Sequence, residues 1–207
     1  MSLAAYIHRI RHSHGFGVHS PEGFNMVKRV LNPSHREGYY GYHRVGSTVC
    51  RLHEQGRPLP PHAERRGRLL LRLAAELRVR SARVSIHEKG ELAASVRSLA
   101  QAALYAADSR MEISVSRPGE IVPGNVAAQL TVHYGRPSDA ARFLDEIRSA
   151  ILRREGNLLL LDIGKELSGD VSALVSEGIV FEGGGSLLIL LRHATPVQRY
   201  SIPEGLL

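Results

Sequence analysis

Polar and charged residues stand at the ends of the apolar stretches that the sequence predicts to be β-strands. The stretch 81–86 runs into a charged, glycine-containing turn at 87–90, and the apolar stretch 158–161 runs into Asp162. In a mostly parallel sheet the carboxyl ends of the strands meet along one edge, where such folds bind ligands. A carboxylate accepts hydrogen bonds, and a glycine lets the backbone approach a ligand closely. The sequence therefore predicts a ligand crevice at this edge.

Apolar patterning predicts the elements that must carry these residues. The stretch 81–107 reads as a strand, a turn and an amphipathic helix, in which Leu92, Val96 and Leu99 recur at spacings of three and four. The order of the segments predicts an α/β protein with a Rossmann-like, mostly parallel sheet of about five or more strands and an N-terminal helical arm. The other predicted strands are 111–115, 129–134, 158–163 and 186–193, and the other predicted helices are 62–80, 137–154 and 168–177.

The first 61 residues are expected to form the arm and a linker. Helices are predicted at 2–12 and 21–31, the second with Ser20 as its N-cap and Pro21 at its first position. The stretch 33–61 is rich in glycine, proline and tyrosine and has little periodicity, so a mostly irregular linker is expected. The predicted division is an arm and linker at 1–61 and a Rossmann-like domain at 62–207.

Length and composition limit the classes of protein that the chain can belong to. Its 207 residues suit one domain with an appended arm. No apolar run approaches the roughly 20 residues that span a bilayer, and no secretory signal is recognisable, so a soluble cytoplasmic protein without membrane partners is expected. The single cysteine, Cys50, cannot form an internal disulfide, and nothing near it in the sequence marks a catalytic thiol.

Positive charge is concentrated in the first part of the chain. Residues 1–80 hold 14 Lys and Arg against 5 Asp and Glu, whereas residues 81–207 hold 13 against 15. Almost all of the cations are arginines, which suit bidentate contacts to phosphate or carboxylate. The tyrosines of YYGY (39–42), beside Arg44, could stack on nucleobases or anchor the linker to the domain. Nucleic acid is therefore one candidate partner, and arginines on solvated helix faces are the alternative that the sequence favours.

Histidines crowd the start of the arm. His8 and His12 would share one face of the expected helix at a spacing that can bind zinc. No carboxylate or thiol accompanies them within that segment. Solvated or packed histidines are therefore favoured, and no metal is predicted.

Three segments carry a resemblance to a known family. They are HGFGVHSPEGF (14–24), YYGY (39–42) and GRLLLRLAAEL (67–77). Together they resemble bacterial S-adenosylmethionine-dependent methyltransferases in which a histidine-rich arm containing His-Ser-Pro precedes a Rossmann-like domain. The resemblance covers about residues 8–195, and its specific matches lie in the arm. It implies a class I methyltransferase fold with S-adenosylmethionine over the first strand–helix turn.

The first turn departs from the pattern that the resemblance implies. Relatives carry an E-x-G-x-x-x-G turn whose small residues admit the cofactor, and here the turn reads IHEKGE (86–91). The resemblance places His87, Glu88 and Gly90 at the cofactor. Only Gly90 keeps a suitable residue type, because the two side chains are bulky where close backbone approach is needed. As a turn before a helix, Gly90 needs no ligand, and this reading stays open beside the first.

The other strand ends depart from the pattern as well. After the second strand, where a carboxylate should hold the ribose, Arg117 cannot accept a hydrogen bond, and Glu120 could substitute only if its loop folds back. After the fourth strand the relatives' Asp-Gly-Asn-His type sequence keeps its aspartate alone, as Asp162, which the resemblance places near the reacting methyl. After the fifth strand the stretch 191–193 lacks the carboxylates that could hold a metal.

The resemblance and its departures lead to two hypotheses. The first is a methyltransferase-like protein with an eroded cofactor site, whose activity is weak or lost and whose methyl acceptor the sequence does not identify. The alternative is a non-catalytic binding or assembly protein that uses arginines such as Arg65, Arg66 and Arg68 on nucleic acid or an acidic partner. A homodimer that buries the arm and a sheet edge is a third hypothesis.

Overall fold

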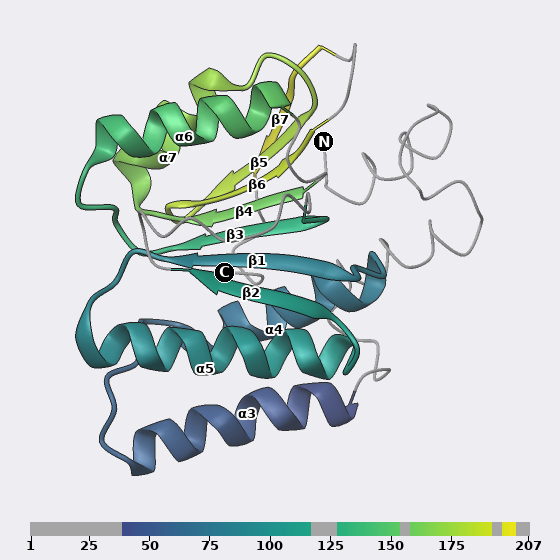
Figure 1. Ribbon diagram of the computed structural model, residues 1–207, viewed down its shortest axis with the longest axis vertical. Helices are drawn as coiled ribbons and strands as arrows, with labels where there is room; N and C mark the ends of the chain where they lie inside the picture. Colours follow the sequence, from purple (N-terminus) through teal and green to yellow (C-terminus); the bar gives the residue numbers. More distant parts are fainter. Residues whose placement is uncertain (1–38, 117–127, 154–157, 192–195, 202–207) are drawn as a thin grey trace.

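The computed structural model describes residues 39–116, 128–153, 158–191 and 196–201. The helices expected at 2–12 and 21–31, with His8 and His12, lie outside the described residues, and so does Glu120. Within the described residues, strands form a single sheet with helices on both of its faces (Figure 1).

The sheet has seven strands in the order β2-β1-β3-β4-β6-β5-β7. β6 runs antiparallel to both of its neighbours, and every other neighbouring pair is parallel. The prediction of an α/β protein with a mostly parallel sheet is confirmed, and the arrangement is compatible with a Rossmann-like fold. The strands are β1 (Ser81–Ile86), β2 (Glu112–Ser116), β3 (Leu130–Tyr134), β4 (Leu158–Asp162), β5 (Ile179–Gly183), β6 (Ser186–Leu190) and β7 (Gln198–Ser201).

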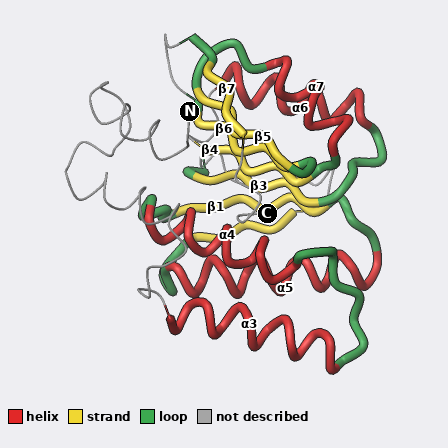
Figure 2. The backbone as a smooth tube through the Cα atoms, turned by 180° about the vertical axis from the view of Figure 1, so that it is seen from behind, coloured by secondary structure: helices red, strands yellow, loops and turns green. Residues whose placement is uncertain are grey.

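Two helical layers pack on opposite faces of the sheet (Figures 1 and 2). Alternate residues of β4 divide between them: Leu158 and Leu160 belong to the core under α4 and α5, and Leu159 and Leu161 belong to the core under α6 and α7. This division follows from the two-residue period of a strand buried on both faces. The helices are α3 (Tyr39–Glu54), α4 (Ala63–Glu76), α5 (Gly90–Ala107), α6 (Ala140–Arg153) and α7 (Lys165–Leu174).

Residues 39–54 of the segment expected to be an irregular linker form a helix. α3 covers 16 residues and packs against α4 and α5, which separate it from the sheet (Figures 1 and 2). Its buried residues Val45, Thr48 and Leu52 share one face. The prediction was wrong because glycines and aromatic residues lower helix propensity, and tertiary packing of this face overrides that local preference.

A glycine lets α3 and α4 approach closely. A Cβ built on Gly67 of α4 would lie 2.7 Å from Cγ1 of Val45 on α3. Because Gly67 has no side chain, the buried Val45 of α3 can pack directly against α4 at this position.

Replacing Gly67 with alanine is expected to destabilise the protein by about 1 kcal/mol, because overpacking outweighs the gain in helix propensity. Gly46 of α3 provides a matched control, since a Cβ there would meet only Oε1 of Glu64, at 3.7 Å. Gly46→Ala is expected to stabilise by about 0.5 kcal/mol. Chemical denaturation of both variants measures the difference, and equal effects of the two substitutions would contradict this account of the contact.

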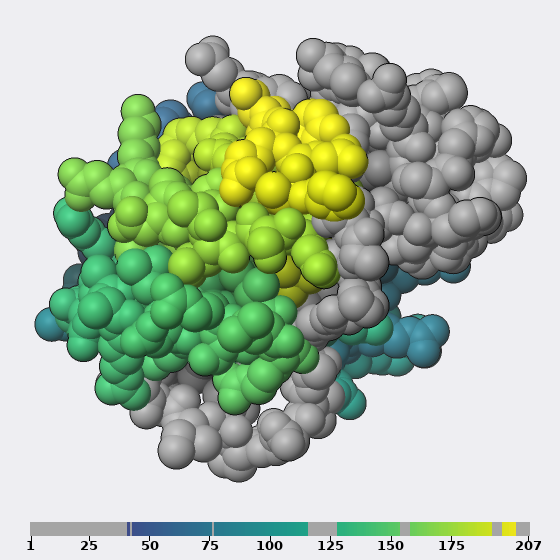
Figure 3. Space-filling view, turned by 90° about the horizontal axis from the view of Figure 1, so that it is seen from above, coloured from purple at the N-terminus to yellow at the C-terminus, as the bar shows by residue number. Residues whose placement is uncertain are grey.

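The C-terminal part of the sheet contains two strands that the sequence patterning missed. β5 precedes the glycine turn that leads into β6, and β7 lies within the expected tail, at the surface beside β5 (Figure 3, yellow). Arg199 of β7 holds this edge, because its guanidinium donates to the carbonyl oxygens of Ser172 (2.8 Å) and Val175 (3.4 Å) at the end of α7. The chain itself therefore supplies the three strands that lie beyond β4 in the sheet.

None of the helices in the described part of the chain has the length and apolar character needed to cross a membrane.

Candidate functional site

The strands β1 and β3 define the place where a ligand crevice is expected. β1 leads into α5 on one face of the sheet, and β3 leads into α6 on the other, so the chain diverges between these two neighbouring strands (Figure 1). Such a switch point is where open α/β sheets bind ligands. The strand ends align across the sheet, because the His87 amide donates to the Tyr134 carbonyl (2.7 Å) and the Gly135 amide to the Asp162 carbonyl (2.8 Å).

The Glu88 side chain fills the space above this switch point. Gly135 has a φ of 86°, and a Cβ built on it would lie 2.5 Å from Oε1 of Glu88 and 2.7 Å from its Cδ and Cγ. The carboxylate arm therefore rests directly on the Gly135 backbone. The beginning of α4 closes the remaining side with Ala63, Arg66 and Gly67, and the cavity left there has a volume of about 30 Å³.

Gly90 lies where the sequence predicted it, at the turn that begins α5. Its φ of 63° is in the left-handed region, which explains the need for glycine at this position. Apart from its chain neighbours and the backbone of its own helix, no atom lies within 4 Å of the position that a Cβ would take. The turn is therefore open at Gly90, whereas the neighbouring switch point is filled by Glu88.

His87 packs on the opposite face of the sheet, toward α6. Its ring stacks on His133 of β3 with a centroid distance of 5.4 Å, and both rings meet the edge of Phe143. Nε2 of His87 lies 3.2 Å from Nδ1 of His133, so one imidazole donates to the other. Burial lowers the pKa of His87 to about 4, and burial with the nearby charges of His87 and Arg83 lowers the pKa of His133 to about 3. The pair is neutral at pH 7.

Asp162 lies at the end of β4 and is held by Arg66 of α4. The guanidinium approaches both carboxylate oxygens: its Nε lies 2.7 Å from Oδ2, and its NH2 group donates to Oδ1 at 3.1 Å. The Ser186 hydroxyl donates to Oδ1 at 3.4 Å. Burial raises the pKa of Asp162, while Arg66 opposes that rise. A carboxylate engaged in this way is poorly placed to act as a base toward a substrate.

Asp162 also borders the larger cavity of this region, whose volume is about 570 Å³. Its wall includes the cationic side chains of Arg65, Arg66 and Lys165, the acidic side chain of Glu182 and the ring of Tyr134. The three residues predicted at the first turn, His87, Glu88 and Gly90, do not line it. Asp162 and Glu88 thus line different cavities, although the charge of Glu88 lies near enough to help raise the pKa of Asp162.

No family model matches the chain, and the searches of curated proteins and of solved structures return no match. The predicted methyltransferase resemblance and its cofactor thus remain predictions.

No group of three or more metal-ligating side chains occurs within the residues that the structure describes. Cys50 is exposed on α3.

The sequence patterning did not single out His133 or Gly135, and it did not indicate that Arg66 pairs with Asp162. Arg66 is one of several arginines in a basic helix, and Asp162 follows it by 96 positions, so no local spacing marks the pair. His133 lies within a short strand. Gly135 follows the end of β3, as Gly90 follows β1, and this recurrence of glycine at strand ends was the available signal.

Replacing Gly135 with alanine is expected to destabilise the protein by about 2 kcal/mol, because both the positive φ and the contact with Glu88 oppose a Cβ. Removing the Glu88 side chain relieves only the contact. In a double-mutant cycle measured by denaturation, Glu88→Ala should therefore recover part of the loss. Strict additivity of the two substitutions would mean that Glu88 does not rest on Gly135 in solution.

Proposed function

We propose that this chain is a methyltransferase-like protein that has lost methyl transfer and acts by non-catalytic binding. The observation that carries the proposal is the Glu88 side chain lying on Gly135 at the switch point between β1 and β3. A charged side chain of the protein itself stands where the resemblance would place S-adenosylmethionine.

The remaining volume supports the loss of a cofactor site. Pockets that bury small molecules measure about 300–1,000 Å³. The cavity beside Glu88 has a volume of about 30 Å³. The side of this cavity formed by α4 is tied to the strand end by the Arg66–Asp162 ion pair.

The chemistry at the other strand ends also disfavours methyl transfer. The residue after β2 is Arg117, which cannot accept from ribose hydroxyls. Asp162 is occupied by Arg66 and faces the larger cavity, which the first turn does not line. That cavity has the size of a small-molecule site, but a ligand there would not contact His87, Glu88 or Gly90.

A nuclear magnetic resonance titration tests the proposal at the residues concerned. Millimolar S-adenosylhomocysteine is expected to leave the amide signals of Gly90 and Gly135 unchanged, as it should leave the signal of Gly56, a remote loop glycine. Saturable shifts at Gly90 and Gly135 but not at Gly56 would refute the loss of the site.

The alternative function is binding of nucleic acid or an acidic partner through arginines. Only arginines without a carboxylate partner in the protein itself are available for it. Arg66 is paired with Asp162, and Arg68 is paired with Glu64 on the same helix. Arg65 is exposed and lines the larger cavity. Two of the three arginines singled out in the sequence therefore have acidic partners within the protein, which leaves Arg65 and the arginines of α3 as candidates. The homodimer hypothesis stays a prediction.

A further inference from the structure

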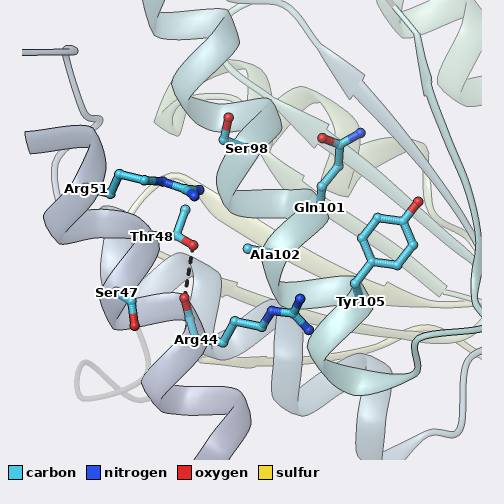
Figure 4. Close-up of a pocket in the computed structure, with 8 residues that line it drawn as sticks. All are labelled: Arg44, Ser47, Thr48, Arg51, Ser98, Gln101, Ala102 and Tyr105. Atoms are coloured by element: carbon cyan, nitrogen blue, oxygen red, sulfur yellow. Dashed lines mark hydrogen bonds between the residues drawn. The ribbon is translucent and has the colours of Figure 1, made fainter. Parts of the chain in front are cut away.

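A second polar hollow lies on the outer helical layer, away from the strand ends. It is a groove of about 450 Å³ between α3 and α5 (Figure 4). Each helix contributes one wall, and the side chains of both walls are drawn in the close-up. The lining residues are Arg44, Ser47, Thr48 and Arg51 from α3, and Ser98, Gln101, Ala102 and Tyr105 from α5.

The charged side chains that line the groove are all positive. None of its eight lining residues is acidic, and two are arginines. Among the residues that the structure describes, neither Arg44 nor Arg51 has a carboxylate within ion-pair distance. Of the two arginines that line the strand-end cavities, Arg66 is paired with Asp162 and only Arg65 is not. The groove therefore favours an anionic partner.

The hydrogen-bonding groups of the groove are mainly donors. The hydroxyls of Ser47 and Thr48 donate back to carbonyl oxygens of α3, those of His43 (2.5 Å) and Arg44 (3.0 Å), so they offer only lone pairs to a partner. The two guanidinium groups carry several N–H donors each, and the amide of Gln101 adds more. Phosphate oxygens are acceptors that suit this set.

The spacing of the arginines indicates a polymer and not one small anion. Arg44 and Arg51 are seven residues apart on α3, which places them about 10 Å apart along the helix axis. Their guanidinium groups extend toward α5 at separate levels of the groove (Figure 4). Each can thus contact a different phosphate of one strand.

An aromatic ring stands on the same wall as the polar residues of α5. Tyr105 has 42% of its surface exposed and is one of only two large hydrophobic residues exposed to this extent within the described part of the chain. A base that stacks on an exposed aromatic ring next to a cationic groove is the usual arrangement in proteins that bind single strands, and such stacking contributes about 1–3 kcal/mol per base.

We propose that the groove between α3 and α5 binds single-stranded nucleic acid, with Arg44 and Arg51 on successive phosphates and a base on Tyr105. The groove shares none of its lining residues with either strand-end cavity. The proposal therefore stands or falls independently of the loss of methyl transfer.

Fluorescence anisotropy with a labelled single-stranded oligonucleotide and the full chain tests this proposal. Arg44→Gln/Arg51→Gln is expected to weaken binding at least tenfold, and to reduce the slope of log affinity against log salt by about 1.4, since each phosphate contact on a single strand contributes about 0.7. Tyr105→Ala should weaken binding about tenfold or more and leave the salt slope unchanged.

A matched control removes the same charge from the other layer. Arg142→Gln/Arg148→Gln alters two exposed arginines of α6 and is expected to change affinity less than threefold. All these positions are exposed, and circular dichroism verifies that the variants fold. The proposal is overturned if the two double variants weaken binding equally, if duplex competes better than single strand, or if the wild-type chain does not bind.

Discussion

Lowering the pH from 7 to 5 is expected to reduce the free energy of unfolding by about 4 kcal/mol through the His87–His133 pair. Burial holds the pKa of His87 at about 4 and that of His133 at about 3 in the folded protein, whereas an unfolded histidine titrates near 6.5. Below pH 6.5 the unfolded chain therefore binds more protons than the folded protein. Stability rises with pH wherever that holds, so it is lost as the pH falls from about 6.5 toward 4.

Urea denaturation at a series of pH values measures this loss. The variant His87→Gln/His133→Gln keeps polar side chains at both positions but cannot titrate, so its stability should vary much less between pH 7 and 5. His53→Gln changes an exposed histidine of α3 and should keep the wild-type slope. A slope that is the same in the double variant and in the wild type would show that other groups cause the pH dependence.

Replacing Arg66 with alanine is expected to destabilise the protein by about 3 kcal/mol at pH 7. The substitution leaves Asp162 without its cation, and removing one partner of a buried ion pair costs about 3–5 kcal/mol. The lower end of that range applies because the Arg66 side chain is 32% exposed, whereas the Asp162 side chain is 11% exposed.

Two comparisons distinguish the cost of leaving Asp162 without a counter-charge from the cost of the packing that is lost with the Arg66 side chain. Arg66→Ala/Asp162→Ala should recover more than half of the loss, because no charge is left unpaired. Burial already raises the pKa of Asp162 and Arg66 opposes that rise, so without Arg66 the pKa should rise further. The loss of unfolding free energy in Arg66→Ala should then become smaller as the pH falls through the pKa of Asp162, because the folded state of this variant binds the proton more readily than the unfolded state does. A deficit independent of pH and of Asp162 would mean that Arg66 acts by packing alone.

The sequence predicted elements whose local pattern agrees with their tertiary role. β1, α5 and β4 have strong patterns: one short strand, one long amphipathic helix, and one run buried on both faces. α3 could not be predicted in this way because it depends on a contact between two helices, in which Val45 packs against Gly67. β7 has an edge position and four residues with little apolar character, so only its pairing with β5 defines it.

The sequence predicted where the candidate site lies but not that side chains of the protein itself fill it. Gly90 and Asp162 do stand at the ends of β1 and β4. That Glu88 turns onto Gly135, and that Arg66 reaches Asp162, depends on how β3 and α4 meet at the strand ends, 47 and 96 residues away in the chain. Local spacing carries no information on contacts of that separation.

We propose that Glu88 fills the crevice of this mostly parallel sheet and that S-adenosylmethionine does not bind there. Calorimetric titration of the full chain with S-adenosylmethionine, and with its demethylated product, tests it most directly. The account predicts no saturable heat at micromolar concentrations of either ligand. Micromolar binding that is abolished by Gly90→Trp, in a variant whose circular dichroism spectrum matches that of the wild type, would contradict it.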